Sequence, residues 1–349
     1  MLEHGGRLRA AALRYGIPEA DWLDLSTGIN PNGWPVPPLP DVIWQRLPQN
    51  DDGLLQAAQD YYGTNRLLAV AGSQAAIQAL PALRLRARVA LLATSYAEHA
   101  HAWQRHGHEV VAVSAEDMLQ ANADVKIIVN PNNPTGKFFT RDVLLNMHAQ
   151  LMQRGGWLVV DEAFMDSTPE LSLASVCPRP GLIVLRSLGK FFGLAGARVG
   201  FVLAKENILS PLAELLGPWP IAAPSRHVAM LALRDDAWQR KTRAALPLAA
   251  QRLAALLSTH HLTPHGGCNL FQWVRCADAV NVHQQLAQQG ILTRLFEQPA
   301  SLRFGLPRGE AQWAHLAEAL SICRSGFNPT ASLQNVGLKP DLRTADHPT

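Results

Sequence analysis

The chain has 349 residues, 31 basic and 28 acidic side chains, a formal net charge of +3 and 48% hydrophobic residues. This composition is typical of a globular protein and excludes an intrinsically disordered one, and the small basic surplus gives no indication of a nucleic-acid partner. At roughly 150 residues per domain, the length predicts about two domains.

The chain carries neither of the sequence signals expected of a membrane or an exported protein. Its apolar runs are shorter than the roughly 20 residues of a membrane-spanning helix, and its opening MLEHGGRLRA lacks the apolar core of a signal peptide. The cysteines have neither the number nor the spacing of a disulfide framework or a zinc site. We therefore expect a cytoplasmic protein in which Cys177, Cys268, Cys276 and Cys323 are free thiols.

Seven short apolar runs recur in the first two thirds of the chain, and each predicts a β-strand. The runs are nearly continuous, which is typical of strands buried on both faces of a largely parallel sheet. Helical patterns at 73–83, 97–106 and 141–154 separate them, so the order of elements predicts a doubly wound α/β fold, whereas the first 40 residues are expected to be irregular. The predicted strands are residues 67–70, 89–92, 110–113, 127–130, 157–161, 182–185 and 199–203.

The composition changes after Leu216, where the proline-rich stretch GPWPIAAPS predicts a hinge. A helix-prone stretch follows at 225–258, with Pro247 as its expected break or kink. Strands at 269–275 and 301–305 and helices at 280–289 and 310–324 then predict a smaller α+β unit. The expected division is an N-terminal segment 1–35 that joins the small domain, a large domain 36–221, a small domain 222–325 and a poorly ordered tail 326–349.

Polar motifs follow three of the predicted strands. NPNNPTG at 130–136 follows one strand, Asp161 ends the next, and Lys190 lies in the loop SLGK after a third. Because open α/β sheets bind ligands beyond the carboxyl ends of their strands, these motifs indicate one shared site. Taken singly, they also fit a turn, a helix cap and a surface charge.

The residues around Lys190 add a hydroxyl at Ser187 and a guanidinium at Arg198, in the motif GLAGARVGF. Arg198 can hold a phosphate with its planar fork, or it can form a structural salt bridge. A desolvated lysine, an acid, a hydroxyl and an arginine together form the set that pyridoxal phosphate needs. The lysine forms a Schiff base, the acid pairs with the ring nitrogen, and the other two hold the phosphate.

The order NPNNPTG, DEAF, SLGK and GARVGF resembles the fold-type I, aminotransferase-like pyridoxal phosphate enzymes over roughly residues 20–325. Within that superfamily the chain is similar to histidinol-phosphate aminotransferases and to the threonine-phosphate decarboxylases of cobalamin biosynthesis. HGG at 4–6, LDLSTGINPNG at 23–33, RSLGKFFGLAGARVGF at 186–201 and LRFGLP at 302–307 resemble the decarboxylases. The resemblance implies a large domain with a mostly parallel seven-stranded sheet flanked by helices, plus a smaller α+β domain.

The resemblance also implies a role for each residue that matches a family motif. The catalytic residues would be Lys190, which holds the cofactor, and Asp161, which pairs with its ring nitrogen. The remaining cofactor-binding residues would be Asn133 at the ring oxygen, Tyr96 stacked on the ring, and Ser187, Arg198, Gly72, Ser73 and Gln74 at the phosphate. Arg303 would receive the substrate carboxylate, with His4 and Asn30 as further substrate contacts.

Two positions depart from the aminotransferase pattern. Phe164 stands where many aminotransferases have a tyrosine that bonds the ring oxygen, so Asn133 acts there without it. Leu47 stands before Pro48 where relatives often have a tyrosine that reaches the partner subunit's cofactor phosphate. The decarboxylases tolerate phenylalanine at the first position, which favours that family.

The activity implied is the decarboxylation of L-threonine O-3-phosphate to (R)-1-amino-2-propanol O-2-phosphate by a homodimer that binds neither nucleic acid nor membrane. The alternative is an aminotransferase of the histidinol-phosphate type, which would use the same residues. A pyridoxal-binding regulator would need a DNA-binding domain, for which the roughly 35 residues before the catalytic body are too few. We expect no metal site, since the histidines at 99, 101, 106 and 108 lack helical i, i+4 spacing, although His99 is placed to support Tyr96.

Overall fold

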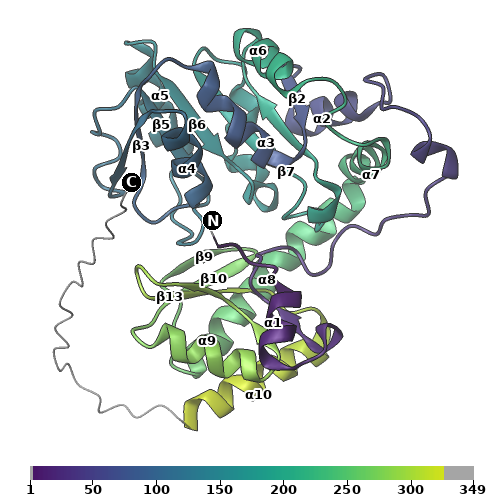
Figure 1. The fold of residues 1–349 in the computed structure, drawn as a ribbon, viewed down its shortest axis with the longest axis vertical. Coiled ribbons are helices and arrows are strands. Elements are labelled where there is room, and N and C mark those ends of the chain that lie inside the picture. Colours follow the sequence, from purple (N-terminus) through teal and green to yellow (C-terminus); the bar gives the residue numbers. More distant parts are fainter. Residues whose placement is uncertain (1–2, 326–349) are drawn as a thin grey trace, which may run out of the picture.

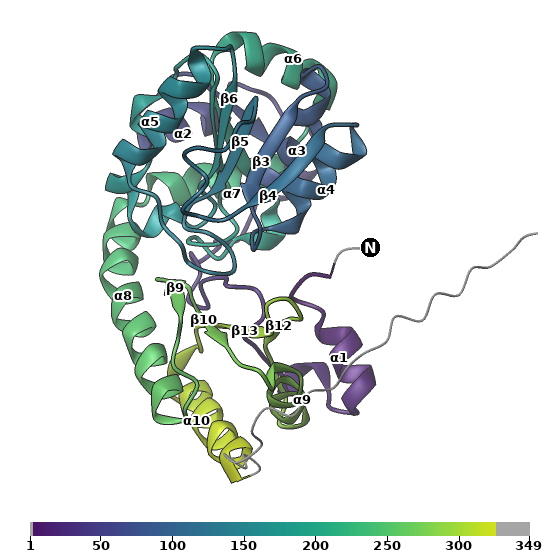
Figure 2. The same cartoon turned by 90° about the vertical axis from the view of Figure 1, so that its left-hand side faces the viewer.

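The computed structural model describes residues 3–325, and the predicted tail at 326–349 lies outside them. Figure 1 shows two lobes: a large lobe built on a seven-stranded sheet, and a small lobe built on a four-stranded sheet. The helix α8 (Asp236–Thr259) runs along one side of the molecule from the large lobe to the small one (Figure 2).

The large sheet has the strand order β2-β8-β7-β6-β5-β3-β4, in which β8 is antiparallel to both neighbours and the inner strands are parallel. This order confirms the predicted mostly parallel seven-stranded sheet. Its strands are β2 (Leu67–Val70), β3 (Arg88–Leu92), β4 (Glu109–Val113), β5 (Val125–Val129), β6 (Trp157–Asp161), β7 (Leu182–Ser187) and β8 (Gly200–Leu203).

Helices cover both faces of this sheet, which explains why the strands read as continuous apolar runs. One face packs against α3 (Gly72–Ala79), α4 (Ala97–Arg105) and α6 (Glu206–Leu216). The other face packs against α2 (Leu54–Tyr62), α5 (Arg141–Met152) and α7 (Ala223–Arg234). The short 3₁₀ turns are Glu19–Asp21, Asp41–Trp44, Leu80–Leu83, Met165–Ser167, Pro169–Leu171, Ala174–Val176 and Ala195–Ala197.

The alternation of side chains along β6 and β7 decides which face each polar strand end serves. Val159 and Leu185 pack on the face that α3 and α4 cover. Residues two further along the same strands point to the same face, so Asp161 and Ser187 lie toward α3 and α4. Arg186 has the opposite parity and points to the other face.

The small lobe holds the antiparallel sheet β12-β13-β10-β9 with α9 (Ala279–Gln288) and α10 (Gly309–Ser325). Its strands are β9 (Gly266–Cys268), β10 (Phe271–Arg275), β12 (Arg294–Phe296) and β13 (Ser301–Gly305). The N-terminal part of the chain joins this lobe, because β1 (Leu23–Asp24) pairs in parallel with β11 (Ile291–Leu292) and α1 (Leu8–Tyr15) packs near α9. The domain boundaries at 35, 221 and 325 stay predictions.

Two expectations about local structure are wrong. The first 40 residues are not irregular throughout, because the good helix formers LRAAALRY make α1, which ends where left-handed Gly16 donates its N–H to the Ala12 carbonyl. The long helix-prone stretch does break, but at Asp235, whose carboxylate caps α8 by accepting from the Trp238 N–H. Pro247 remains inside α8, where its missing N–H removes one hydrogen bond without ending the helix.

A buried ion cluster lies on the α5 side of the sheet. The Arg186 guanidinium donates to Glu162 and Asp166, and all three side chains are at most 1% exposed. Ser172 donates its hydroxyl to Glu162 and accepts from Arg186 at 3.0 Å. Two buried acids thus share one cation, so the cluster depends on Arg186.

Replacing Arg186 with leucine should destabilise the protein by roughly 3–5 kcal/mol, since it leaves two buried carboxylates without their cation. Urea unfolding, followed by circular dichroism, measures the change. Arg88→Leu is the matched control, because Arg88 pairs with Glu109 at the surface, and it should move the midpoint far less. An equal shift in both variants would contradict the importance of the cluster.

Candidate active site

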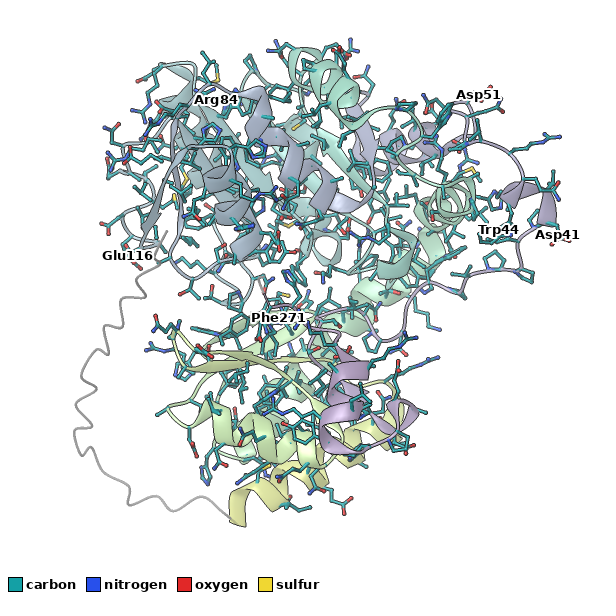
Figure 3. The ribbon with its side chains drawn as sticks, viewed as in Figure 1. Asp41, Trp44, Asp51, Arg84, Glu116 and Phe271 are labelled. Carbon is teal, nitrogen blue, oxygen red and sulfur yellow. The ribbon has the colours of Figure 1, made fainter. Side chains whose placement is uncertain are left out.

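A cavity of about 510 Å³ lies where the two lobes meet, and both lobes line it. Phe271 of β10 marks this level of the molecule in Figure 3. The cavity gathers several residues that the sequence singled out, together with one that it did not, Arg294. Its polar lining includes His4, Tyr96, Asn133, Lys190, Arg294 and Arg303.

Lys190 lies in the loop after β7, and its amine donates to the Thr27 carbonyl at 3.0 Å. The amine also lies 5.4 Å from the centre of the Phe164 ring. Burial and the nearby Arg303 lower the pKa of Lys190 to about 8, against the opposing effect of Asp161. Near neutral pH a far larger fraction of this amine is therefore uncharged and nucleophilic than of an ordinary lysine.

Asp161 ends β6 and is only 3% exposed. Its Oδ2 accepts from His99 Nε2 at 2.9 Å and its Oδ1 accepts from the Ala163 N–H at 3.1 Å. His99 projects from α4, as the alternation of β6 requires. These two donors hold the carboxylate in one orientation, and His99 contacts both Asp161 and Tyr96.

Tyr96 caps the start of α4 and lies over this part of the site. Its ring meets His99 edge-on, with centroids 6.2 Å apart, and its hydroxyl donates to Gln74 Oε1 at 3.2 Å. Burial and the Asp161 charge raise the pKa of Tyr96 to about 12, so its hydroxyl remains a donor. Phe164 is buried opposite, against Phe271, and offers no hydroxyl of its own.

The start of α3 and the loop before β8 form a cradle for an anion. Gly72 opens α3 with φ +71°, and a Cβ there would lie 2.7 Å from Arg198 Nη2. Only glycine therefore lets the guanidinium lie against the first turn, where free backbone N–H groups also point outward. Ser187 lies nearby at the end of β7, where its Oγ accepts from the Gly189 N–H at 3.2 Å.

Asn133 and Arg303 join the two lobes. Arg303 of β13 donates from Nη1 to Asn133 Oδ1 and from Nη2 to the Ser26 carbonyl. Its buried Nε has no hydrogen-bond partner among the described residues. Burial, with Arg294 close by, lowers the pKa of Arg303 to about 10. Because Arg303 binds the oxygen of the Asn133 amide, Nδ2 of Asn133 is the atom that can donate to a ligand. The Nε–H of Arg303 is likewise a donor without a partner among the described residues.

The two proposed substrate contacts have different surroundings. His4 lines the cavity and donates from Nε2 to Glu98 at 2.7 Å. Asn30 is 3% exposed and both ends of its amide are used, since Nδ2 donates to the Phe191 carbonyl and Oδ1 accepts from the Asn32 N–H. The structure thus places Asn30 beneath the lysine loop, where it braces Lys190 and does not reach the cavity.

Sequence reasoning missed Glu98, Gln78 and Arg294. Glu98 is a nearly buried acid in the first turn of α4, and Gln78 of α3 donates to it at 3.0 Å. Arg294 begins β12 and lines the cavity. The only signal available for Glu98 was an acid two residues after an aromatic, and Arg294 comes from a distant strand that no motif marks.

Residues 3–325 contain no group of three or more histidine, cysteine or acidic side chains arranged to hold a metal ion. Over the same residues, no helix is both long enough and apolar enough to cross a membrane.

The lowered pKa of Lys190 can be measured on the protein without added ligand. Competitive labelling with acetic anhydride, read by mass spectrometry of the Lys190 peptide, should give a midpoint near 8, against 10.5 for an ordinary lysine. Arg303→Gln removes a positive charge that lowers this pKa, so its midpoint should be higher. A midpoint near 10.5 in the native protein would show that the amine is not enclosed as described.

The comparisons with known proteins agree with this geometry. Residues 21–320 match the family model described as aminotransferase class I and II. The chain is 58% identical to threonine-phosphate decarboxylase of Pseudomonas aeruginosa over 92% of its own length and 97% of that protein. It is 42% identical to threonine-phosphate decarboxylase of a Sinorhizobium species over 91% and 97% of the two chains. Relatives named histidinol-phosphate aminotransferase match over shorter stretches.

A solved structure carries a similar fold. Histidinol-phosphate aminotransferase from Sinorhizobium meliloti, in complex with pyridoxal-5'-phosphate, aligns with a TM-score of 0.78 at 22% identity. The alignment covers 93% of this chain and 95% of that one. The matched range includes every element that carries the site except the N-terminal segment with His4. The chain belongs to the aminotransferase class I and II family, among the relatives named threonine-phosphate decarboxylase.

Proposed function

We propose that this chain uses pyridoxal phosphate to decarboxylate L-threonine O-3-phosphate, giving (R)-1-amino-2-propanol O-2-phosphate and carbon dioxide in cobalamin biosynthesis. The observation that carries the proposal is the 58% identity to a threonine-phosphate decarboxylase over nearly the whole chain. The geometry of the cavity supports it, because a partly uncharged lysine lies among side chains suited to a phosphorylated amino acid.

The residues present fit pyridoxal phosphate at both ends of the site. Near β6, the Asp161 carboxylate is buried and fixed by two donors, as a partner for a protonated ring nitrogen must be. Near α3, the Gly72 backbone leaves room for Arg198 beside free N–H groups, which is a phosphate cradle. Lys190, which would bind the cofactor covalently, lines the same cavity.

The residues that would hold the cofactor follow from this fit. Lys190 would bind it covalently, Asp161 would face the ring nitrogen, and Tyr96 would cover the ring. Asn133 would donate from Nδ2 to the ring oxygen, since its Oδ1 already accepts from Arg303. The cofactor phosphate would accept hydrogen bonds from Ser187, from Arg198 and from the first turn of α3, which includes Ser73 and Gln74.

During the reaction the protein would support the charge of the cofactor ring and supply a proton to the substrate. When bound, pyridoxal phosphate supplies an electron-accepting ring that takes up the electron pair left when the carboxyl group departs. His99 and the Ala163 N–H hold the Asp161 carboxylate in the orientation in which it would face that ring. Lys190 lines the cavity, and its amine would carry a proton on Nζ to the substrate's α-carbon.

Cations in the cavity select the substrate. Arg303 would bind the substrate carboxylate through its unsatisfied Nε–H and the Nη hydrogens that Asn133 and Ser26 do not use. Arg294 lies in the same cavity and provides further positive charge for a phosphate group, and the His4 ring lines the cavity beside it. A substrate with a carboxylate and a phosphate therefore matches the charges of the cavity better than a neutral amino acid does.

A homodimer in the cytoplasm is part of the proposal. Trp44 is 67% exposed on the segment that projects from the large lobe, as Figures 1 and 3 show. Leu47 and Trp219 are also more than half exposed. Large apolar side chains at the surface support burial against a second copy of the chain. The free state of Cys177, Cys268, Cys276 and Cys323 supports a reducing compartment.

The first test is carbon dioxide release from L-threonine O-3-phosphate with added pyridoxal phosphate and no oxo acid. Stoichiometric release with aminopropanol phosphate is the expected result, because decarboxylation needs no amino acceptor. Lys190→Ala should lose nearly all turnover. Glutamate formed from histidinol phosphate and 2-oxoglutarate, without carbon dioxide release, would instead make the chain an aminotransferase.

Asp161→Asn tests the charge beside the ring. The asparagine keeps an oxygen for the Ala163 N–H, so the variant should fold and bind cofactor, whereas turnover should fall at least about a hundredfold for want of the negative charge. Fluorescence titration measures cofactor binding, and initial rates measure turnover. A wild-type rate would mean that another group supports the ring nitrogen.

A further inference from the structure

Glu98 is a nearly buried acid for which the reaction described above has no use. It is the second residue of α4, and its side chain is 12% exposed. Its Oε1 accepts from His4 Nε2 at 2.7 Å, and its Oε2 accepts from Gln74 Nε2 at 2.8 Å and from Gln78 Nε2 at 3.0 Å. Three donors from two other parts of the chain therefore converge on one carboxylate, which offsets the cost of burying it.

The first of these donors belongs to the N-terminal segment, which is fixed on both sides of His4. Before it, Arg294 Nη2 donates to the Glu3 carbonyl at 2.7 Å. After it, the Gly6 N–H donates to Ser26 Oγ at 2.7 Å, and Gly5 packs so closely that a Cβ would lie 2.3 Å from the Ser26 carbonyl oxygen. The segment itself is thus anchored on the small lobe, and the His4 side chain extends from it to Glu98 in α4 of the large lobe.

The other carboxylate oxygen of Glu98 is connected to the Tyr96 hydroxyl through the side-chain amide of Gln74. Glu98 accepts from the amide nitrogen of Gln74, which turns the amide oxygen of Gln74 toward the Tyr96 hydroxyl. His4 and Tyr96 are also ring neighbours, with centroids 6.2 Å apart. One carboxylate therefore orients two side chains that line the cavity, one from each lobe.

We propose that Glu98 is a positioning residue that holds the N-terminal segment against the large lobe through His4 and so closes the cavity over the substrate. Because Nε2 of His4 is bound to Glu98, Nδ1 is the ring nitrogen left for the substrate. Removing Glu98 frees the His4 ring and leaves the segment held only by its small-lobe contacts, without touching Lys190, Asp161 or Arg198. The kinetic part of this inference rests on the proposed function, whereas the ordering of the segment does not.

An acid in the first turn of a helix also interacts favourably with the helix dipole, independently of His4. That purely structural role predicts a lower melting temperature for any Glu98 variant and no dependence on residue 4. Positioning predicts instead that Glu98 and His4 act as one unit. A double-mutant cycle separates the two roles, because coupled residues give non-additive effects.

The kinetic test compares Glu98→Ala, Glu98→Gln, His4→Ala and the double variant Glu98→Ala/His4→Ala. Loss of a hydrogen bond to a charged group predicts a KM for L-threonine O-3-phosphate raised about tenfold or more in each single alanine variant, with a smaller change in kcat. The double variant should be no worse than the single ones. Glu98→Gln keeps the size and one acceptor, so its KM should lie between. Glu109→Ala, at an exposed acid of β4, should match the wild type.

The second readout needs no substrate. Limited trypsin digestion of the protein with bound cofactor should cut after Arg7 several-fold faster in Glu98→Ala and in His4→Ala than in the wild type, because the segment then keeps only its small-lobe contacts. Equal cleavage rates with additive KM effects would overturn the proposal. Faster cleavage in a protein that fails to decarboxylate would leave the positioning role standing and overturn only the proposed function.

Discussion

The site depends on a constraint set by the large sheet, whose strands are covered by helices on both faces. A strand in such a sheet has no solvent-facing side, so polar chemistry is confined to the strand ends. Asn133, Asp161 and Ser187 follow or end the neighbouring strands β5, β6 and β7. Because these strands are parallel, their carboxyl ends meet at one edge, and side chains about 28 residues apart in the chain come together.

Because successive side chains of a strand point to opposite faces of the sheet, the site residues and the buried ion cluster lie on different faces. Asp161 and Ser187 point toward α3 and α4, where His99, Tyr96 and the start of α3 surround the cavity. Arg186, one residue before Ser187, points to the opposite face and holds Glu162 and Asp166 in a buried cluster. A shift of one residue in the register of β7 would exchange these two side chains and abolish both arrangements.

The cavity concentrates positive charge, and this has two effects. Arg303 lies close enough to Lys190 to lower its pKa, which makes the amine a better nucleophile. The same charges favour a substrate with two anionic groups. Two of the acids nearby are tied to specific donors: Asp161 to His99, and Glu98 to His4 and two glutamines. They therefore orient side chains and do not pair with Arg303, whereas Arg294 lies 3.6 Å from the Glu3 carboxylate.

The sequence by itself determined the strands of the large sheet and their mostly parallel character, and it predicted a site built on Lys190, Asp161, Asn133, Ser187 and Arg198. These follow from local signals, namely continuous apolar runs and motifs fixed in order along the chain. Local signals failed where a boundary depended on a cap: α1 was missed, and the break before α8 falls at Asp235 rather than at Pro247.

Only the tertiary structure decided the contacts between distant segments. Asn30 lies in a motif that predicted a substrate contact. Its amide instead donates to the carbonyl of Phe191, next to Lys190 and about 160 residues further along the chain. Glu98, His4 and Arg294 come from three separate parts of the chain, and neither spacing nor periodicity relates them. Their meeting depends on how the small lobe and the N-terminal segment pack on the large lobe, and that packing is set by the sum of many contacts rather than by any one motif.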